Sequence, residues 1–216
     1  MRTPGDDFEL IRGLLYAEDI YKKSQNIDLE VIETNKNGFS IINATIAKEK
    51  LGKGFLNKRT LLSVSSCGIC GKQKIEDINV SGDKLLDKVS VTPRQLEKLF
   101  LQMQKHQIIF DKTGGSHAAA IFNNNYEMIA VREDIGRHNA VDKVIGSLLD
   151  KNKLKEASLL LVSGRVSYEI ISKAFIANIP IVASVSASST LAVDFSKEFG
   201  MKLIGFCRED NATYYT

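Results

Sequence analysis

The chain has 216 residues, of which 44% are hydrophobic and 25% charged, as in an ordinary globular protein. These values exclude the disordered, collagen-like and disulfide-scaffold classes. Lys and Arg exceed Asp and Glu by 29 to 26, and this formal net charge of +3 does not indicate nucleic-acid binding. The longest uncharged stretch, residues 174–193, contains Asn178 and Pro180, so it predicts helix, turn and buried strand rather than a membrane span. With no secretion leader and an odd number of cysteines, the sequence predicts a cytoplasmic protein.

An amphipathic helix is predicted at the start of the chain. Thr3 is a suitable N-cap and Pro4 suits the first helical position. Phe8, Ile11 and Leu15 then recur at helical spacing. These three side chains are expected to form one apolar face.

Two β-rich runs follow, at residues 29–32 and 39–46, joined by the polar turn Asn35-Lys36-Asn37-Gly38. An Asn-Gly turn between such runs predicts a β-hairpin. Residues 74–90 are polar without a sustained period, which predicts a linker. The sequence therefore divides into a smaller α+β domain, residues 1–90, and a second domain, residues 91–216.

The second domain is predicted to be α/β. It opens with a proline-containing capping box, Thr92-Pro93-Arg94-Gln95, and a helix that buries Leu96, Leu99, Phe100 and Met103. Strands are predicted at 117–122, 127–131, 159–162, 181–185 and 202–206, and helices at 137–149, 167–177 and 190–199, the last ended by Gly200. Short apolar strands that alternate with helices predict a sheet covered on both faces.

Cys67-Gly68-Ile69-Cys70 is the sharpest chemical motif. Two thiols at this spacing can form a redox dithiol, half of a zinc site, or a nucleophile with a neighbouring resolving thiol. A buried structural pair is the remaining alternative. Gly68 and Gly71 argue against it, because glycines beside reactive groups mark a mobile or tightly turning loop.

A zinc site is disfavoured by the rest of the sequence. Beyond the pair, ligands would have to come from Cys207 and three histidines, all distant and unpaired. The zinc deaminase signature is also absent, because His117 is followed by Ala118 and Ala119. We therefore predict no metal site.

Two turns are candidates for anion binding. In Glu133-Asp134-Ile135-Gly136-Arg137-His138-Asn139, backbone N–H groups, Arg137 and His138 can face an anion, while a simple capping role for Asp134 is the alternative. Ser163-Gly164-Arg165 also lies between an apolar strand and a helix. Because ligands favour the carboxyl ends of strands in α/β sheets, the two turns side by side would form a phosphate-binding crevice with Arg137 and Arg165.

The segment after the last strand, Gly205-Phe206-Cys207-Arg208-Glu209-Asp210-Asn211, combines an aromatic face, a planar cation and carboxylate acceptors. This set of groups suits a purine base, although the segment alone is a weak signal.

Together these segments resemble the formate dehydrogenase accessory sulfurtransferase family (FdhD/NarQ). The resemblance covers nearly the whole chain and is carried, in the family's order, by Cys67-Gly68-Ile69-Cys70-Gly71, residues 113–120, residues 133–143, residues 163–169, residues 184–193 and Gly205-Phe206-Cys207.

The resemblance implies a two-part protein whose C-terminal part has a cytidine-deaminase-like α/β fold without deaminase activity. Such proteins pass sulfur from a cysteine desulfurase to the molybdenum or tungsten of a bis(molybdopterin guanine dinucleotide) cofactor, which formate dehydrogenase needs. By resemblance, Cys67 carries the persulfide, and Cys70 shields, reduces or relays the sulfur. The cofactor-binding segment falls on Phe206, Cys207, Arg208, Glu209, Asp210 and Asn211. A homodimer is expected, and a permanently bound cofactor is not.

A hypothesis from a different class remains open beside this one. The chain would then be a non-catalytic module that binds a guanine-containing ligand, with cysteines that are only redox-sensitive. Persulfide mass on the cysteine loop, after incubation with a desulfurase and cysteine, distinguishes the two hypotheses.

Overall fold

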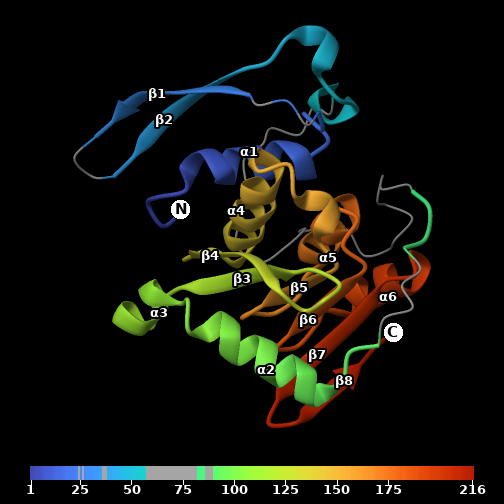
Figure 1. The fold of residues 1–216 in the computed structure, drawn as a ribbon. Helices are drawn as coiled ribbons and strands as arrows, with labels where there is room; N and C mark the ends of the chain where they lie inside the picture. The colour runs from blue at the N-terminus through green and yellow to red at the C-terminus, as the bar shows by residue number, and fades with distance from the viewer. Residues whose placement is uncertain (24, 26, 36–37, 57–81, 86–89) are drawn as a thin grey trace.

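A six-stranded mixed sheet forms the centre of the molecule (Figure 1). The structure, a computed structural model, describes residues 1–23, 25, 27–35, 38–56, 82–85 and 90–216. The strand order β4-β3-β5-β6-β7-β8 contains β3 (His117–Phe122), β4 (Met128–Asp134), β5 (Leu159–Val162), β6 (Ile181–Ser184), β7 (Lys202–Arg208) and β8 (Asn211–Tyr214). Strands β5, β6 and β7 are parallel. Strand β3 is antiparallel to both β4 and β5, so β4 points the same way as β5.

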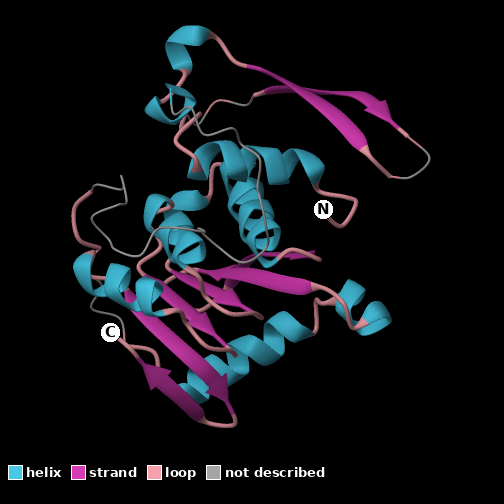
Figure 2. Ribbon diagram, turned by 180° about the vertical axis from the view of Figure 1, so that it is seen from behind, coloured by secondary structure: helices cyan, strands magenta, loops and turns pink. Residues whose placement is uncertain are grey.

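Helices cover both faces of this sheet (Figures 1 and 2). One face carries α4 (Arg137–Asp150), α5 (Tyr168–Ile176) and α6 (Thr190–Glu198), and the other carries α2 (Pro93–Gln104), which leads into α3 (Ile108–Thr113). Successive strand residues enter opposite cores, as Leu160 and Leu161 do, which is why these strands are apolar throughout. The predicted covered α/β sheet is confirmed, and the cytidine-deaminase-like detail of its topology stays a prediction.

The N-terminal part is α+β. It contains α1 (Asp7–Ala17), β1 (Asp28–Thr34), β2 (Ser40–Thr45) and the 3₁₀ turns η1 (Lys48–Lys50) and η2 (Lys53–Leu56). Strands β1 and β2 form the predicted antiparallel hairpin, which projects beyond α1 (Figure 2). Residues 36–37 of its turn, and most of the predicted linker, lie outside the described residues.

The predicted start of the first helix is wrong. Helix α1 begins at Asp7, and no side chain caps it. Thr3 is bound elsewhere: its N–H donates to Asp134 (3.0 Å), its hydroxyl accepts from the N–H of Ile135 (2.9 Å), and its carbonyl accepts from Lys143 (2.9 Å). These contacts hold Thr3 against the turn between β4 and α4, and the chain then bends through Gly5 and Asp6, which have positive φ, before the helix starts.

The buried face of α1 also differs from the predicted apolar stripe. Phe8 is 43% exposed, whereas Arg12 and Gly13 are the buried residues. Gly13 lies against the backbone of Asp142 in α4, where any Cβ would overlap the Asp142 carbonyl oxygen. The close approach of two helix backbones, rather than an apolar stripe, therefore decides which side of α1 faces the core. Since α1 packs directly on α4, the boundary between residues 1–90 and 91–216 crosses this contact, and the two-domain division stays a prediction.

Most predicted elements of the second part are confirmed. The capping box of α2 is present, with Thr92 and Gln95 bonded to each other's backbone N–H, and its four predicted apolar side chains are buried. Helix α3, the 3₁₀ turn η4 (Leu154–Glu156) and strand β8 are additional elements that the sequence patterns did not indicate. Among the described residues, no helix combines the length and apolarity needed to cross a membrane.

Candidate functional site

One edge of the sheet gathers the turns that the sequence singled out. Because β4, β5, β6 and β7 share a direction, their carboxyl ends meet there, together with the first residue of β3, His117. Neighbouring turns are hydrogen-bonded to each other: Ser184 Oγ donates to the carbonyl of Gly164 (2.6 Å), and the N–H of Phe206 donates to the carbonyl of Ser186 (3.2 Å). The edge is therefore a connected framework, at the position where α/β sheets usually bind ligands.

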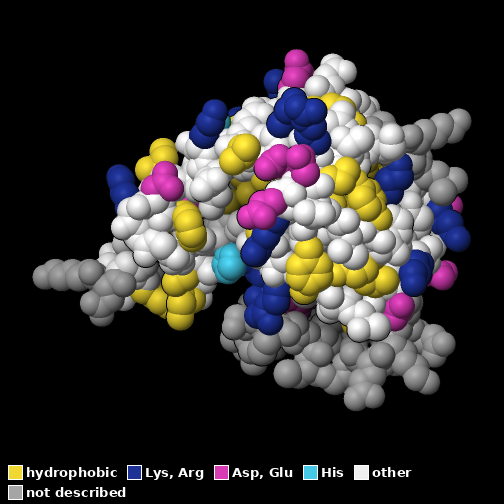
Figure 3. Space-filling view, turned by 90° about the horizontal axis from the view of Figure 1, so that it is seen from below, with side chains coloured by type: hydrophobic (Ala, Val, Ile, Leu, Met, Phe, Trp, Pro, Cys, Tyr) yellow, Lys and Arg dark blue, Asp and Glu magenta, His cyan; other side chains and the backbone are white. Residues whose placement is uncertain are grey.

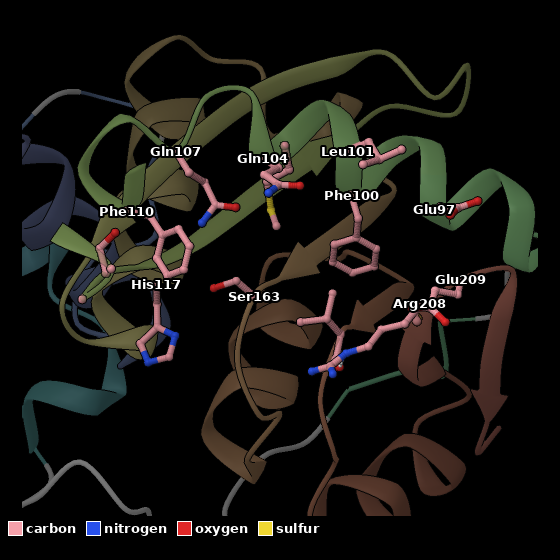
Figure 4. A pocket seen from close by; sticks show the side chains of 16 residues that line it. Glu97, Phe100, Leu101, Gln104, Gln107, Phe110, His117, Ser163, Arg208 and Glu209 are labelled. Carbon is pink, nitrogen blue, oxygen red and sulfur yellow. Dashed lines mark hydrogen bonds between the residues drawn. The ribbon is translucent and has the colours of Figure 1, made fainter. Parts of the chain in front are cut away.

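A pocket of about 570 Å³ opens between this edge and helices α2 and α3 (Figure 4). Phe100, Leu101 and Gln104 come from α2, and Phe110 lies close to His117 at the end formed by α3. Arg208 and Glu209 lie at the opposite end. The remaining lining residues are Glu97, Met103, Gln107, Gly114, Gly115, Ser116, Ser163, Val185 and Cys207. Aromatic and aliphatic walls with a few polar groups are typical of a small-molecule site.

Only the middle part of the predicted cofactor-binding segment, residues 206–211, is among the described residues that line this pocket. Cys207, Arg208 and Glu209 line it, and Arg208 Nε donates to the carbonyl of Val185 (2.9 Å). Phe206 is 48% exposed, with φ of 52°, at an irregularity in the pairing of β7 with β8. Such bulges re-aim the side chains that follow them, so this strained position turns the next residues toward α2.

The last residues of the segment form a tight hairpin turn. Glu209 and Asp210 have φ values of 49° and 58°, between the paired residues Arg208 and Asn211. Two successive left-handed residues are the geometry of a type I′ turn, which matches the twist of the flanking strands. Asp210 and Asn211 are exposed on this turn.

The Cys207 thiol has an unreactive environment. The side chain is 3% exposed, and burial raises the pKa of this thiol to about 11. The thiolate is the nucleophilic form of cysteine, so at neutral pH this residue presents a protonated, weakly nucleophilic group to the pocket. Its position suits packing against a ligand rather than carrying sulfur.

A group of four basic side chains, the cationic cluster, lies beside the pocket: His117, Arg137, His138 and Arg165. Burial lowers the pKa of His117, and the nearby charges of Arg137, Arg165 and His138 lower it further. A Cβ on Gly164 would lie 3.0 Å from His117 Nδ1 and 3.7 Å from Arg137 Cδ, so the turn passes close to these two side chains and any larger residue would press on the His117 ring. Arg137 and Arg165 thus both lie near His117, and their role in binding an anion stays a prediction. Figure 3 shows one face of the molecule on which Lys and Arg side chains lie beside a histidine.

His138 also joins the cluster to α5. Its Nε2 lies 2.9 Å from Ser167 Oγ and 3.0 Å from a Glu169 oxygen. The hydrogen bond from His138 lowers the pKa of Glu169. An orienting carboxylate of this kind fixes the imidazole ring beside the cluster.

The acidic residues of the same turn have structural partners. Asp134 is fully buried and accepts hydrogen bonds from the N–H of Gly136 (2.8 Å) and from Asn139 (3.0 Å), and it pairs with Lys143 (2.8 Å). Asp134 therefore fixes the turn before α4, although the helix has Gly136 at its N-cap and no side-chain cap hydrogen bond. Arg137 and His138 belong to the cationic cluster, and anion binding by this turn stays a prediction.

Cys67 and Cys70 lie outside the described residues. Among the residues that the structure describes, no group of three or more His, Cys, Asp or Glu side chains could hold a metal ion.

Sequence reasoning did not identify the α2 and α3 side of the pocket. Gln104, Gln107 and Phe110 face the strand ends only through the tertiary packing of those helices. Gln104 and Gln107 next to the buried Met103 gave a weak signal, because amides beside an apolar stripe are available for a polar ligand.

Comparisons with known proteins agree with the sequence resemblance. The model of the FdhD/NarQ family matches residues 1–216. The chain belongs to the FdhD/NarQ family. One relative, the sulfur carrier protein FdhD of Mycolicibacterium paratuberculosis, is 42% identical over all of this chain and 82% of its own length. The sulfur carrier protein FdhD of Saccharolobus solfataricus is 39% identical over all of this chain and 80% of its own length.

A solved structure supports the family's fold for this chain. The crystal structure of a protein described as a formate dehydrogenase accessory protein, from Desulfotalea psychrophila, superposes with a TM-score of 0.70 at 22% identity. The similarity covers all of this chain and 80% of that one. This FdhD/NarQ chain therefore shares its architecture with a known protein of low sequence identity.

Proposed function

We propose that this FdhD/NarQ protein is a sulfur carrier that serves formate dehydrogenase. The observation that carries the proposal is the family match over residues 1–216, together with Cys67-Gly68-Ile69-Cys70 in this sequence and relatives about 40% identical that are named sulfur carrier protein FdhD. The proposal includes a cysteine desulfurase as donor, a cytoplasmic location and a homodimer.

The chemistry proposed for Cys67 is persulfide exchange. Its thiolate attacks the terminal sulfur of the donor's cysteine persulfide, an S–S bond forms on Cys67, and the donor cysteine leaves as a thiolate. No net oxidation occurs in this step. Release of the terminal sulfur as sulfide needs two electrons, which the Cys70 thiol would supply by forming a disulfide with Cys67.

The substrate proposed for the pocket is the guanine dinucleotide part of a bis(molybdopterin guanine dinucleotide) molybdenum or tungsten cofactor. The cationic cluster supports a place for the phosphates, because Arg137 and Arg165 can make charge-assisted hydrogen bonds to phosphate oxygens. The Glu209 carboxylate at the other end can accept hydrogen bonds from the guanine edge, and Phe100 offers an aromatic surface. Arg208 and Cys207 complete that end.

A second candidate is a guanine-ligand module whose cysteines are only redox-sensitive. The pocket and the cationic cluster favour it, because the described residues that form them all lie between positions 97 and 209. The two functions differ in whether Cys67 takes up sulfur.

Substitution of the loop cysteines tests the proposal. Cys67→Ser keeps the size of the side chain but replaces a good nucleophile with a poor one, so we expect persulfide formation and activation of formate dehydrogenase to be lost. Cys207→Ser is the matched control for persulfide formation, which should persist because the Cys207 thiol is protonated. The measurements are protein mass after incubation with a desulfurase and cysteine, and formate dehydrogenase activity in a host that lacks its own accessory protein. Full client activity of Cys67→Ser would contradict the proposal.

A further inference from the structure

Helix α3 is short and buries none of its own side chains, so little within the helix stabilises its position. It is only six residues long, and among those residues, 108–113, none is buried. Ile108 is 62% exposed and Phe110 40% exposed. A helix this short is unstable in isolation, so its position must come from contacts with the rest of the protein.

Among the described residues, the carboxylate of Glu133, near the end of β4, binds the backbone of α3 directly. Its oxygens accept hydrogen bonds from the backbone N–H groups of Ile109 and Phe110, both at 2.8 Å. These N–H groups belong to the first turn of α3, where no carbonyl within the helix can accept from them. A negative charge at the N-terminal end of a helix adds a favourable interaction with the helix dipole. Glu133 is 8% exposed, so this interaction is screened little by water.

The same carboxylate holds the other end of the segment. Ser116 Oγ, just before β3, donates to Glu133 Oε1 at 2.7 Å. Glu133 therefore binds both ends of the stretch from Ile109 to Ser116. This stretch contributes Phe110, Gly114, Gly115 and Ser116 to the pocket, and His117 follows it directly.

The position of Glu133 in the sheet explains why it can do this. It is paired with Ala118, whose side chain enters the core on the α2 side, so Glu133 faces α2 and α3. The next residue, Asp134, faces the opposite side and fixes the turn that carries Arg137 and His138. Adjacent carboxylates thus fix the two parts of the site separately.

We infer that Glu133 is a positioning residue for ligand binding: it holds α3 as a preformed wall of the pocket, with Phe110 beside His117. The inference rests on the proposed function, since it takes the guanine dinucleotide of the cofactor as the ligand. A wall that is already ordered does not have to lose conformational freedom when the ligand binds. Losing the Glu133 contacts should weaken binding because α3 must then be ordered by the ligand.

The test compares binding of methylanthraniloyl-GDP, followed by fluorescence polarisation, to the wild-type protein, Glu133→Gln and Glu127→Gln. The Glu133→Gln substitution keeps the shape of the side chain but places an amide N–H₂ among N–H donors, and we expect at least a fivefold loss of affinity. Glu127 is an exposed residue just before β4 that bonds Asn123 (2.7 Å), so Glu127→Gln should bind as the wild type does.

A spectroscopic measurement separates positioning from general destabilisation. The chain has no tryptophan, so Phe110→Trp introduces a single reporter on α3. Without ligand, adding Glu133→Gln to this variant should shift the tryptophan emission to the red, and adding Glu127→Gln should not. If Glu133→Gln fails to fold, Ser116→Ala and Ser116→Thr take its place. The alanine variant should bind more weakly, and the threonine variant, which keeps the hydroxyl, should restore affinity.

The outcomes distinguish this inference from the proposed function. If the wild-type protein does not bind the nucleotide, cofactor binding in this pocket is overturned, and the positioning role with it. If the wild type binds and Glu133→Gln binds equally well, with unchanged tryptophan emission in the Phe110→Trp background, only the positioning role is overturned.

Discussion

His117 lies where the pocket meets the cationic cluster, and its titration reports on that environment. Burial and the neighbouring cations lower the pKa of His117 below its usual value of about 6.5. The unfolded chain therefore takes up a proton at this residue at a higher pH than the folded protein does. As the pH falls from about 6.5 toward the lowered pKa, this difference destabilises the fold.

We expect His117→Gln to reduce the loss of stability between pH 6.5 and pH 5. Because the ring is only half-buried, the effect should be a fraction of the ~1.4 kcal/mol per pH unit of one fully coupled proton. Urea denaturation at several pH values measures it, with the exposed His106, whose ring bonds the Gln102 carbonyl, replaced by Gln as control. An unchanged slope in His117→Gln would show that this imidazole does not titrate differently in the folded protein.

At the residue scale, the sequence predicted which turns lie at the same edge of the sheet, because each of these motifs directly follows a strand. Arg137 and Arg165 follow strands that proved to share a direction, so the turns meet as expected. The pocket residues Gln104 and Phe110 could not be predicted, because they reach the site only through the docking of α2 and α3. Local hydrophobic periodicity does not indicate where a helix lies across a sheet.

Helix α2 forms one wall of the pocket, and its start depends on a local signal. The Thr92 hydroxyl accepts a hydrogen bond from the N–H of Gln95 (3.3 Å), and the Gln95 amide oxygen accepts one from the N–H of Thr92 (2.9 Å). Tyr214 and Tyr126 also bind the carbonyls of Val91 and Ser90, just before the helix.

Thr92→Ala should lower the free energy of unfolding by about 1 kcal/mol, the usual cost of losing an N-cap side chain. Chemical denaturation measures this change. Thr45→Ala, at an exposed end of β2, is the control for the loss of a threonine side chain and should change stability less. Equal effects of the two substitutions would mean that the capping box contributes nothing beyond local propensity.

The elements differ in how far local sequence determines them. Strand β5 was predicted with its observed bounds, because a short apolar run between polar turns is typical of a buried strand in an α/β domain. Helix α3 depends on Glu133, more than 20 residues away, and β8 depends on pairing with β7. Local hydrophobic patterns do not indicate either of these long-range contacts, so neither α3 nor β8 was predicted.

At the scale of the whole molecule, the N-terminal segment connects the hairpin to the site. Arg2 bonds Ser40 in β2 (3.1 Å) and pairs with Asp7, while the N–H of Thr3 donates to Asp134 at the end of β4. Arg132 in β4 forms a two-pronged pair with Glu9 in α1, at 2.5 and 2.6 Å. The sequence predicted a separate small domain, and these long-range contacts could not be inferred from composition or period.

Helix α1 of the N-terminal part packs directly on α4 of the second part, and two glycines permit this contact. A Cβ on Gly13 would overlap the carbonyl oxygen of Asp142, and a Cβ on Gly146 would overlap that of Glu9. The helices therefore touch backbone to backbone at two points, which no larger residue allows without separating them.

Gly13→Ala and Gly146→Ala should each destabilise the protein by about 1–3 kcal/mol, as overpacking in a close-packed interior does, despite alanine's better helix propensity. Gly115→Ala is the control, since its added Cβ would meet no described atom closer than 3.8 Å. Denaturant unfolding of the three variants gives the comparison. The double variant should lose less than the sum of the two single losses, because one displacement of α1 relieves both overlaps. If Gly13→Ala or Gly146→Ala proves as stable as the wild type, the backbones of α1 and α4 do not approach each other as closely as the structure shows.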